Sequence, residues 1–367
     1  MARGRRIALV TASAVLAVGA LTAAGCGSDS SSSSNTSGGG SSLSGEIAGA
    51  GASSQAAAQE AWRAGFQEAN SGATVSYDPV GSGGGREQFN AGGIAFAGTD
   101  SAFKDEELTA ANKRCGGVDN LVEIPVYISP IAVAYNLPSV ANLQLSPTTL
   151  AKIMKGTITK WNDPAIAADN PGVDLPSTQI TVVSRSDESG TTENFQQYLK
   201  AVAPDVWTFE PDGNWPVKGG ESAQGTSGVV AAIGAGEGTI GYADESQVGD
   251  LGKASIKVGA NYVGPSAEAA AKILDESPRT TGTGQYVFTY DLKRDTTTEG
   301  IYPIVLTSYL VGCTTYSSAD TAALVKGYFT YVISPEGQQA AATSAGSAPL
   351  SEAQMTALQP AVAAIGS

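Results

Sequence analysis

Three short segments rich in serine and glycine contain the residue types that bind small anions. They are residues 49–54 (GAGASS), 81–85 (GSGGG) and 185–191 (RSDESGT). Each lies between an apolar run typical of a strand and a pattern typical of a helix, so the free backbone N–H groups of a helix start would face a bound anion. Any one segment could also be an ordinary capped helix start, because Ser and Thr are common N-caps and Gly is a common turn residue.

Two charged residues make the hypothesis of an anion site more specific. Arg185 opens the third segment, and Asp100 ends another strand-like run. A guanidinium is a forked, permanently charged donor that suits a tetrahedral oxyanion. A carboxylate repels an anion unless the ligand brings a proton, as phosphate does near neutral pH and sulfate does not. A buried acceptor of this kind therefore discriminates between the two ions. The alternative for Asp100 is that it caps the next helix or pairs with a lysine.

The composition excludes several function classes. Histidine is absent, which removes the commonest general base and metal ligand and weakens most hydrolase readings. Lys and Arg total 21 against 35 Asp and Glu, for a net charge of −14, so a nucleic acid partner is not expected. Residues 236–241 (GEGTIG) fit G-x-G-x-x-G, but they follow a helical pattern and precede a strand, the reverse of a dinucleotide site. We expect neither a metal nor a cofactor.

The elements that must position these residues alternate along the chain. Strand-like runs at 46–50, 74–80 and 94–98 alternate with helical patterns at 55–70, 84–90 and 105–115, which predicts an α/β fold with a mainly parallel sheet. An apolar stretch at 121–137, interrupted by Pro125 and Pro130, predicts consecutive strands that lead into a second α/β domain. The remaining patterns are strands at 179–185, 239–243 and 302–311 and helices at 148–155, 191–202, 228–234, 319–333 and 351–365.

In these motifs and their order the chain resembles the phosphate-binding lipoproteins of bacterial high-affinity phosphate ABC importers, the PstS-like proteins, in their actinobacterial form. The resemblance runs from about residue 45 to the C-terminus, apart from the loop at 204–225. Carried over position by position, it implies these phosphate ligands: Ser53, Ser54, Ser82, Asp100, Arg185, Ser189, Gly190 and Thr191. Ser53 replaces a threonine and Ser54 a phenylalanine of the family pattern, and Ser54 would donate its backbone N–H. Asp187 matches an acid that pairs with the arginine.

The resemblance also implies a fold and a role. The fold would be a type II periplasmic binding protein with two lobes joined by two hinge crossings, lobe I at 45–134 and 304–367 and lobe II at 135–303. The protein would be a monomer that is not an enzyme, and it would deliver phosphate to the permease subunits of the importer. The alternatives are a binder of another tetrahedral oxyanion, a non-transport phosphate sensor or adhesin, and a secreted phosphatase or serine hydrolase.

The N-terminus has the pattern of an exported lipoprotein. Residues 1–25 combine three early arginines, an apolar stretch and small residues, as in a signal peptide. The sequence Ala23-Ala24-Gly25-Cys26 resembles a lipobox, which predicts acylation of Cys26 and a place on the extracytoplasmic face of the membrane. Residues 26–44 are mostly Ser and Gly and predict a flexible tether. The alternative is an ordinary secreted protein whose Cys26 pairs with another thiol.

Two cysteines remain beyond Cys26. In an exported protein, the even pair Cys115 and Cys313 predicts a disulfide. Two buried free thiols are the alternative, because spacing alone does not establish proximity.

Overall fold

A computed structural model describes residues 43–281 and 283–366. The predicted signal peptide, the acylation site Cys26 and the tether up to residue 42 lie outside this part of the chain. The first strand begins at Ser44, the last residue of the predicted tether. None of the helices within the described ranges combines the length and the apolar character needed to cross a membrane.

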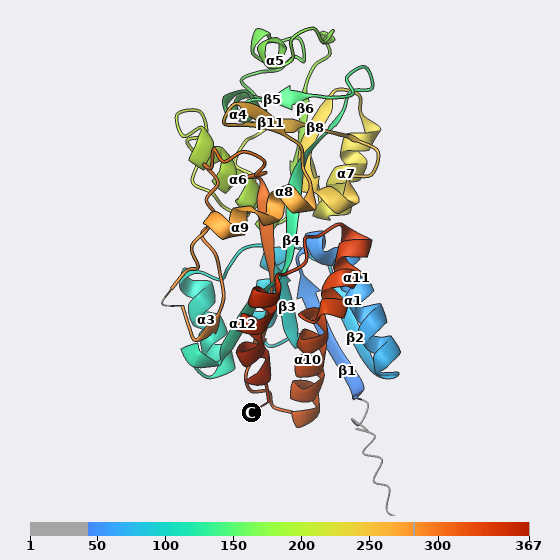
Figure 1. Ribbon diagram of the computed structural model, residues 1–367, viewed down its shortest axis with the longest axis vertical. Coiled ribbons are helices and arrows are strands. Elements are labelled where there is room, and N and C mark those ends of the chain that lie inside the picture. The colour runs from blue at the N-terminus through green and yellow to red at the C-terminus, as the bar shows by residue number, and fades with distance from the viewer. Residues whose placement is uncertain (1–42, 282, 367) are drawn as a thin grey trace, which may run out of the picture. The chain divides into compact units, whose positions relative to one another are not determined.

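A long mixed sheet forms the centre of the fold, as Figure 1 shows. Its first half runs in the order β2 (Gly72–Asp78), β1 (Ser44–Gly51), β3 (Phe96–Thr99), β13 (Val305–Cys313) and β4 (Leu121–Asn136). Its second half continues from β4 through β8 (Thr239–Asp244) and β6 (Thr181–Arg185) to β7 (Glu221–Ala223). We call these two parts the first and second half-sheets. The short strands β9 (Gly252–Lys253) and β12 (Tyr286–Val287) also pair with β4, and β5 (Gln144–Leu145), β10 (Ser255–Val258) and β11 (Asn261–Val263) form a separate sheet.

The α/β expectation is confirmed, but the sheet is less parallel than predicted. Strand β1 pairs in parallel with β2 and β3, and β6 pairs in parallel with β7 and β8. Strand β13 runs antiparallel to β3 and β4, and β4 runs antiparallel to β8, so these two strands join the half-sheets by antiparallel pairing, whereas the short β12 pairs with β4 in parallel. A βαβ pattern predicts parallel pairing only for the strands that it contains, and β13 comes from far along the chain.

The stretch predicted as consecutive strands is one strand, β4, of 16 residues. Its two prolines lie where the ladder of hydrogen bonds is irregular. The pairing of β4 with β13 shifts register next to Pro125, and Pro130 is the last residue to pair with β13 before β4 continues along β8. Proline cannot donate to a ladder, so positions of this kind tolerate it inside a strand.

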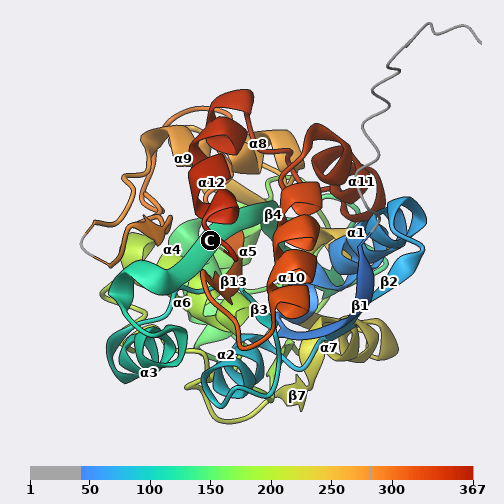
Figure 2. The ribbon, with the colours of Figure 1, turned by 90° about the horizontal axis from the view of Figure 1, so that it is seen from below.

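Helices cover both faces of each half-sheet. In α1 (Ala56–Ala69) the residues Ala58, Trp62 and Phe66, spaced four apart, are all buried, as the helical pattern predicts. On the first half-sheet, one face packs against α1, α10 (Ala319–Val332), α11 (Pro335–Ala345) and α12 (Glu352–Ala363), and the other against α2 (Ser82–Asn90) and α3 (Asp105–Cys115). Figure 2 shows these two groups on opposite sides of the strands.

The second half-sheet is covered in the same way. Helix α7 (Gly225–Ala235) packs on one face, and α4 (Pro147–Met154) and α6 (Gly190–Val202) pack on the other. Helix α7 corresponds to the helix predicted at 228–234, but it begins three residues earlier than expected, at Gly225. The remaining helices are α5 (Pro164–Asp169), α8 (Ala267–Ala271) and α9 (Ile273–Glu276), with single 3₁₀ turns at Ser53–Gln55, Val118–Asn120 and Glu245–Gln247.

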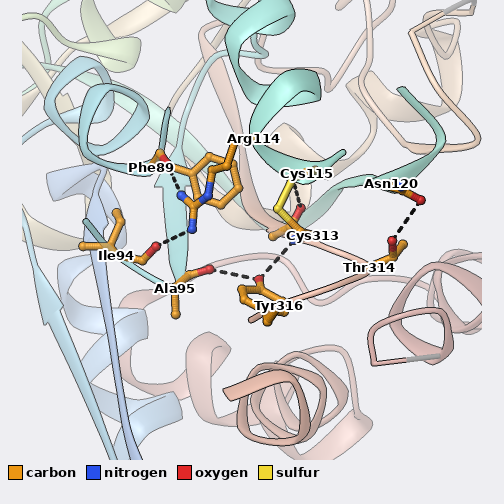
Figure 3. The surroundings of a disulfide bond; sticks show 10 residues. Phe89, Ile94, Ala95, Arg114, Cys115, Asn120, Cys313, Thr314 and Tyr316 are labelled. Carbon is orange, nitrogen blue, oxygen red and sulfur yellow. Dashed lines mark hydrogen bonds between the residues drawn. A yellow bond between two sulfur atoms is a disulfide. The ribbon is translucent and has the colours of Figure 1, made fainter. Parts of the chain in front are cut away.

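The predicted disulfide between Cys115 and Cys313 is present, and Figure 3 shows its surroundings. It joins the end of α3 to the end of β13 across 198 residues of sequence. Next to it, the Arg114 guanidinium lies 3.7 Å from the ring centre of Phe89, and it donates a hydrogen bond of 2.6 Å to the carbonyl oxygen of Ile94. The bond and these contacts tie α3 to the first half-sheet.

Candidate functional site

The predicted ligands lie where strands of the two half-sheets end and helices begin. Ser53 and Ser54 follow β1, Ser82 is the first residue of α2 after β2, and Asp100 follows β3. The carboxyl ends of the parallel strands β1, β2 and β3 lie at one edge of the first half-sheet, which explains why these residues meet.

The other predicted ligands belong to the second half-sheet. Arg185 is the last residue of β6, Ser189 is the N-cap of α6, and Gly190 and Thr191 are its first two residues. All the predicted ligand residues are buried, and Asp100 is only 3% exposed.

Asp100 is the point at which the segments converge. Its Oδ1 accepts a hydrogen bond of 2.7 Å from the Ser54 hydroxyl, and its Oδ2 accepts one of 2.8 Å from the Thr191 hydroxyl. Its backbone N–H donates to the Ser82 hydroxyl at 3.1 Å. Ser54 and Ser82 come from the first half-sheet and Thr191 from the second, so the carboxylate is held by donors from both.

Gly190 allows this close approach between α6 and the first half-sheet. A Cβ atom at this position would lie 2.7 Å from the Ser82 hydroxyl oxygen and 2.8 Å from the Asp100 Cβ, closer than a Cβ atom comes to other non-bonded heavy atoms. The adjacent Ser189 uses its hydroxyl oxygen as the helix cap and accepts a hydrogen bond of 3.2 Å from the backbone N–H of Thr192. Its hydroxyl proton remains able to bond another acceptor.

Arg185 and Asp187 form the pair that the resemblance implied. The Arg185 Nε donates to Asp187 Oδ1 at 2.8 Å, and its Nη2 bonds Oδ2. Burial alone would raise the pKa of Asp187, but the hydrogen bonds and charge of Arg185 and the N–H of Gly225 outweigh it, so the pKa lies below its ordinary value. Asp187 therefore stays ionised and offsets most of the arginine charge.

Ser53 contacts a residue that the sequence analysis missed. Its hydroxyl oxygen lies 3.0 Å from that of Thr226 and accepts a hydrogen bond of 3.1 Å from the Thr226 backbone N–H. Thr226 is in the first turn of α7, where the sequence GTSG repeats the glycine and hydroxyl composition of the other helix starts. This composition could have identified Thr226 as part of a helix start. The sequence analysis missed it because it placed the start of this helix at Gly228.

Two further residues reach Asp100 without a local sequence signal. The Ser308 hydroxyl, on β13, lies 2.6 Å from Asp100 Oδ1, and the Asn194 side-chain amide donates to the Asp100 carbonyl oxygen at 2.7 Å. Strand pairing brings Ser308 here from a distant part of the chain.

Two cavities adjoin this group of residues. One, of about 570 Å³, is lined by Asp100 together with Lys104, Glu193 and Arg294. The other, of about 290 Å³, is lined by Ser53 and Gly225. Over the described residues, no group of three or more Asp, Glu or Cys side chains is arranged to hold a metal ion. The donors to the Asp100 carboxylate are hydroxyls, the adjoining helix starts supply backbone N–H groups, and the charge of the predicted ligand Arg185 is paired with Asp187, an arrangement that suits an anion held by dipoles.

Comparison with known proteins gives the family. Residues 32–336 match the family model described as the PBP superfamily domain. The phosphate-binding protein PstS 3 of Mycobacterium leprae is 35% identical over 332 residues, covering 86% of this chain and 87% of the relative. The chain belongs to the PstS family of phosphate-binding proteins. A mycobacterial relative also fits the actinobacterial type indicated by the motifs.

Solved structures agree with the fold of this PstS-family chain. A high-affinity periplasmic phosphate-binding protein, determined with bound phosphate, superposes with a TM-score of 0.70 at 22% identity over 86% of this chain and 93% of that one. A phosphate-binding protein from Stenotrophomonas maltophilia gives 0.67 at 20% identity, covering 86% and 94%. The predicted fold class, a two-lobed type II periplasmic binding protein, is confirmed.

Proposed function

We propose that this protein binds inorganic phosphate outside the cytoplasm and hands it to an ABC-type importer, without chemical turnover. The observation that carries the proposal is the Asp100 carboxylate, buried among donors from both half-sheets. A carboxylate beside a small anion is favourable only if the ligand donates a hydrogen bond to it, because the two negative charges otherwise repel each other. The family membership supports the same ligand, because the mycobacterial relative is named a phosphate-binding protein.

We infer that eight residues bind the ion. Hydroxyl or backbone N–H donors would come from Ser53, Ser54, Ser82, Ser189, Gly190 and Thr191, the forked positive charge from Arg185, and the acceptor from Asp100. Since Asp187 neutralises Arg185, hydrogen-bond donors rather than net charge would hold most of the ligand charge. The same chemistry makes sulfate a poor ligand, because it offers no proton to Asp100.

Closure between two lobes would trap the ligand. The proposed boundaries are 45–134 and 304–367 for lobe I and 135–303 for lobe II, with β4 and the approach to β13 as the two crossings. A crossing within β4 is supported by its pairing with β13 up to Pro130 and with β8 from Ile131 onward, a change of partner that comes four residues before the proposed boundary. Hinge motion of this kind is common in binding proteins.

The membrane address is part of the proposal. The motif at residues 23–26 supports cleavage before Cys26 and its acylation, so that a monomer would be tethered close to the permease. Cys26→Ser should abolish labelling by a fatty acid and release the protein into the medium. Labelling that persists in this variant would refute the anchor.

Calorimetry with phosphate and with sulfate tests the binding function. We expect tight phosphate binding and only weak sulfate binding by the wild-type protein, with discrimination as high as about 10⁴-fold, typical of sites that recognise a hydrogen-bonding proton of the ligand. Asp100→Asn should weaken phosphate binding and loosen that discrimination, because an amide can donate to sulfate. Equal affinity of the wild type for the two ions would refute the role of Asp100.

A further inference from the structure

A buried chain of hydrogen bonds runs from α10 to Asp100. The Tyr328 hydroxyl donates to Gln59 Oε1 at 2.7 Å, and Gln59 Nε2 donates to Gln55 Oε1 at 2.8 Å. Gln55 Nε2 then donates to the Ser308 hydroxyl oxygen at 2.6 Å, and Ser308 donates to Asp100 Oδ1 at 2.6 Å. Four members of this hydrogen-bonded series are fully buried, each with 0% exposure: Tyr328, Gln59, Gln55 and Ser308.

The direction of the bonds next to the site is fixed by a backbone carbonyl. Gln55 Nε2 also donates to the carbonyl oxygen of Tyr309 at 3.1 Å, and a carbonyl only accepts, so the NH₂ end of the amide must face Ser308. The Ser308 oxygen therefore accepts, and its single proton goes to a different partner. Asp100 Oδ1 at 2.6 Å is closer than the Thr99 carbonyl oxygen at 3.2 Å, and an ionised acceptor forms the stronger bond.

This arrangement makes the two oxygens of Asp100 unequal. Oδ1 accepts from both Ser54 and Ser308, which occupies its two lone pairs. Oδ2 accepts one hydrogen bond, from Thr191, among the residues that the structure describes, and so keeps a lone pair. A proton on a ligand would be received at Oδ2.

The backbone at Ser308 is irregular in a way that suits a positioned side chain. The pairing of β13 with β4 shifts register between Ser308 and Tyr309, which marks a β-bulge or a similar irregularity. Bulges re-aim side chains and are common next to functional sites. The neighbouring Thr307 is equally buried, but its hydroxyl has no hydrogen-bond partner in the described part of the chain.

We propose that Ser308 is a specificity-determining positioning residue that keeps Asp100 an acceptor of hydrogen bonds, so that the site takes a protonated tetrahedral oxyanion and rejects an unprotonated one. This inference rests on the proposed phosphate-binding function. With Ser308 in place, both lone pairs of Oδ1 are occupied, so the carboxylate is held with Oδ2 as the acceptor for the ligand proton. Without Ser308, Oδ1 loses one of its two donors and the carboxylate can rotate, so the acceptor oxygen that faces the ligand is no longer held in place.

The test compares the dissociation constants of sulfate and phosphate, by calorimetry, for Ser308→Ala and Thr307→Val. The two residues are adjacent on one buried strand, and each substitution deletes one hydroxyl, so Thr307→Val is the matched control. Ser308→Ala should lower the ratio of the sulfate Kd to the phosphate Kd about tenfold or more, the effect of losing a hydrogen bond to a charged group. Thr307→Val should leave the ratio unchanged, and Ser308→Thr, which restores the hydroxyl, should return it toward the wild-type value.

If Ser308→Ala leaves the ratio of the two dissociation constants unchanged, the inference is overturned, even if both affinities fall. A purely structural role would weaken the binding of phosphate and of sulfate to the same extent. An equal drop of the ratio in Thr307→Val overturns the inference as well. Failure of the proposed function would look different, since the wild-type protein itself would then bind no phosphate.

Discussion

Glu188→Gln should speed the release of phosphate, because it weakens an ion pair that joins the two half-sheets. Arg86, on α2, places its Nη2 2.6 Å from Glu188 Oε1. Arg86 belongs to the first half-sheet, whereas Glu188 lies in the loop between β6 and α6 of the second. The proposed hinge opening would separate the two groups, so the pair would favour the closed form.

The magnitude follows from the burial of the two partners. The Arg86 side chain is 3% exposed, but that of Glu188 is 41% exposed, so water screens the pair. Exposed pairs contribute about 0.2–1 kcal/mol, and the buried arginine places this pair near the upper value. A loss of about 1 kcal/mol corresponds to an increase of about fivefold in the release rate and in the Kd for phosphate.

The same arginine supplies a matched control. Its Nε lies 2.9 Å from Oε2 of Glu107, on α3 of the first half-sheet, and the Glu107 side chain is 37% exposed. Glu107→Gln removes the same charge at nearly the same exposure without crossing between the half-sheets, so it should leave the release rate unchanged. Stopped-flow release at low and at physiological salt measures both variants. Equal acceleration by the two substitutions, or by neither, would refute the reasoning.

Two further predictions concern stability. The double variant Cys115→Ser, Cys313→Ser should lower the free energy of unfolding by about 2–5 kcal/mol in urea titrations. The phosphate Kd should hardly change, because neither cysteine is among the proposed ligands. A large loss of affinity would contradict this prediction. Burial raises the pKa of Glu123 to about 8 from 4.5, so the folded state favours the protonated form. The free energy of unfolding should therefore fall as pH rises from about 4.5 to about 8. Glu123→Gln should flatten that fall in thermal unfolding, and an unchanged slope would count against it.

The helices were predictable where local signals mark both of their ends. Helix α3 has the predicted bounds, Asp105–Cys115, because three acids occupy its first turn, Lys113 and Arg114 occupy its last turn, and Gly116 ends it in a left-handed conformation. Strand β4 was harder, because Pro125 and Pro130 normally interrupt strands. Only the register shift and the change of partner strand explain why they do not, and neither is visible in sequence.

In the site, too, the residues next to local sequence signals were predictable and the others were not. Ser53, Ser82 and Thr191 belong to helix starts, which have a local composition, and the structure brings these starts together. Ser308 belongs to a buried strand, where a serine looks like any small residue. Its contact with Asp100 depends on how β13 pairs with β3 and β4, and thus on residues about two hundred positions apart. No local pattern carries that information.

The electrostatics of the site explain why such a residue should matter. The chain has a net charge of −14, Arg185 is paired with Asp187, and Asp100 adds a negative charge at the point of convergence. Attraction between opposite net charges therefore cannot select the ligand. What distinguishes one tetrahedral anion from another here is which atoms carry protons and which lone pairs are free. In the proposed site, Thr191 from one half-sheet and Ser308 from the other determine which lone pair of Asp100 stays free, so both would influence specificity together with Arg185.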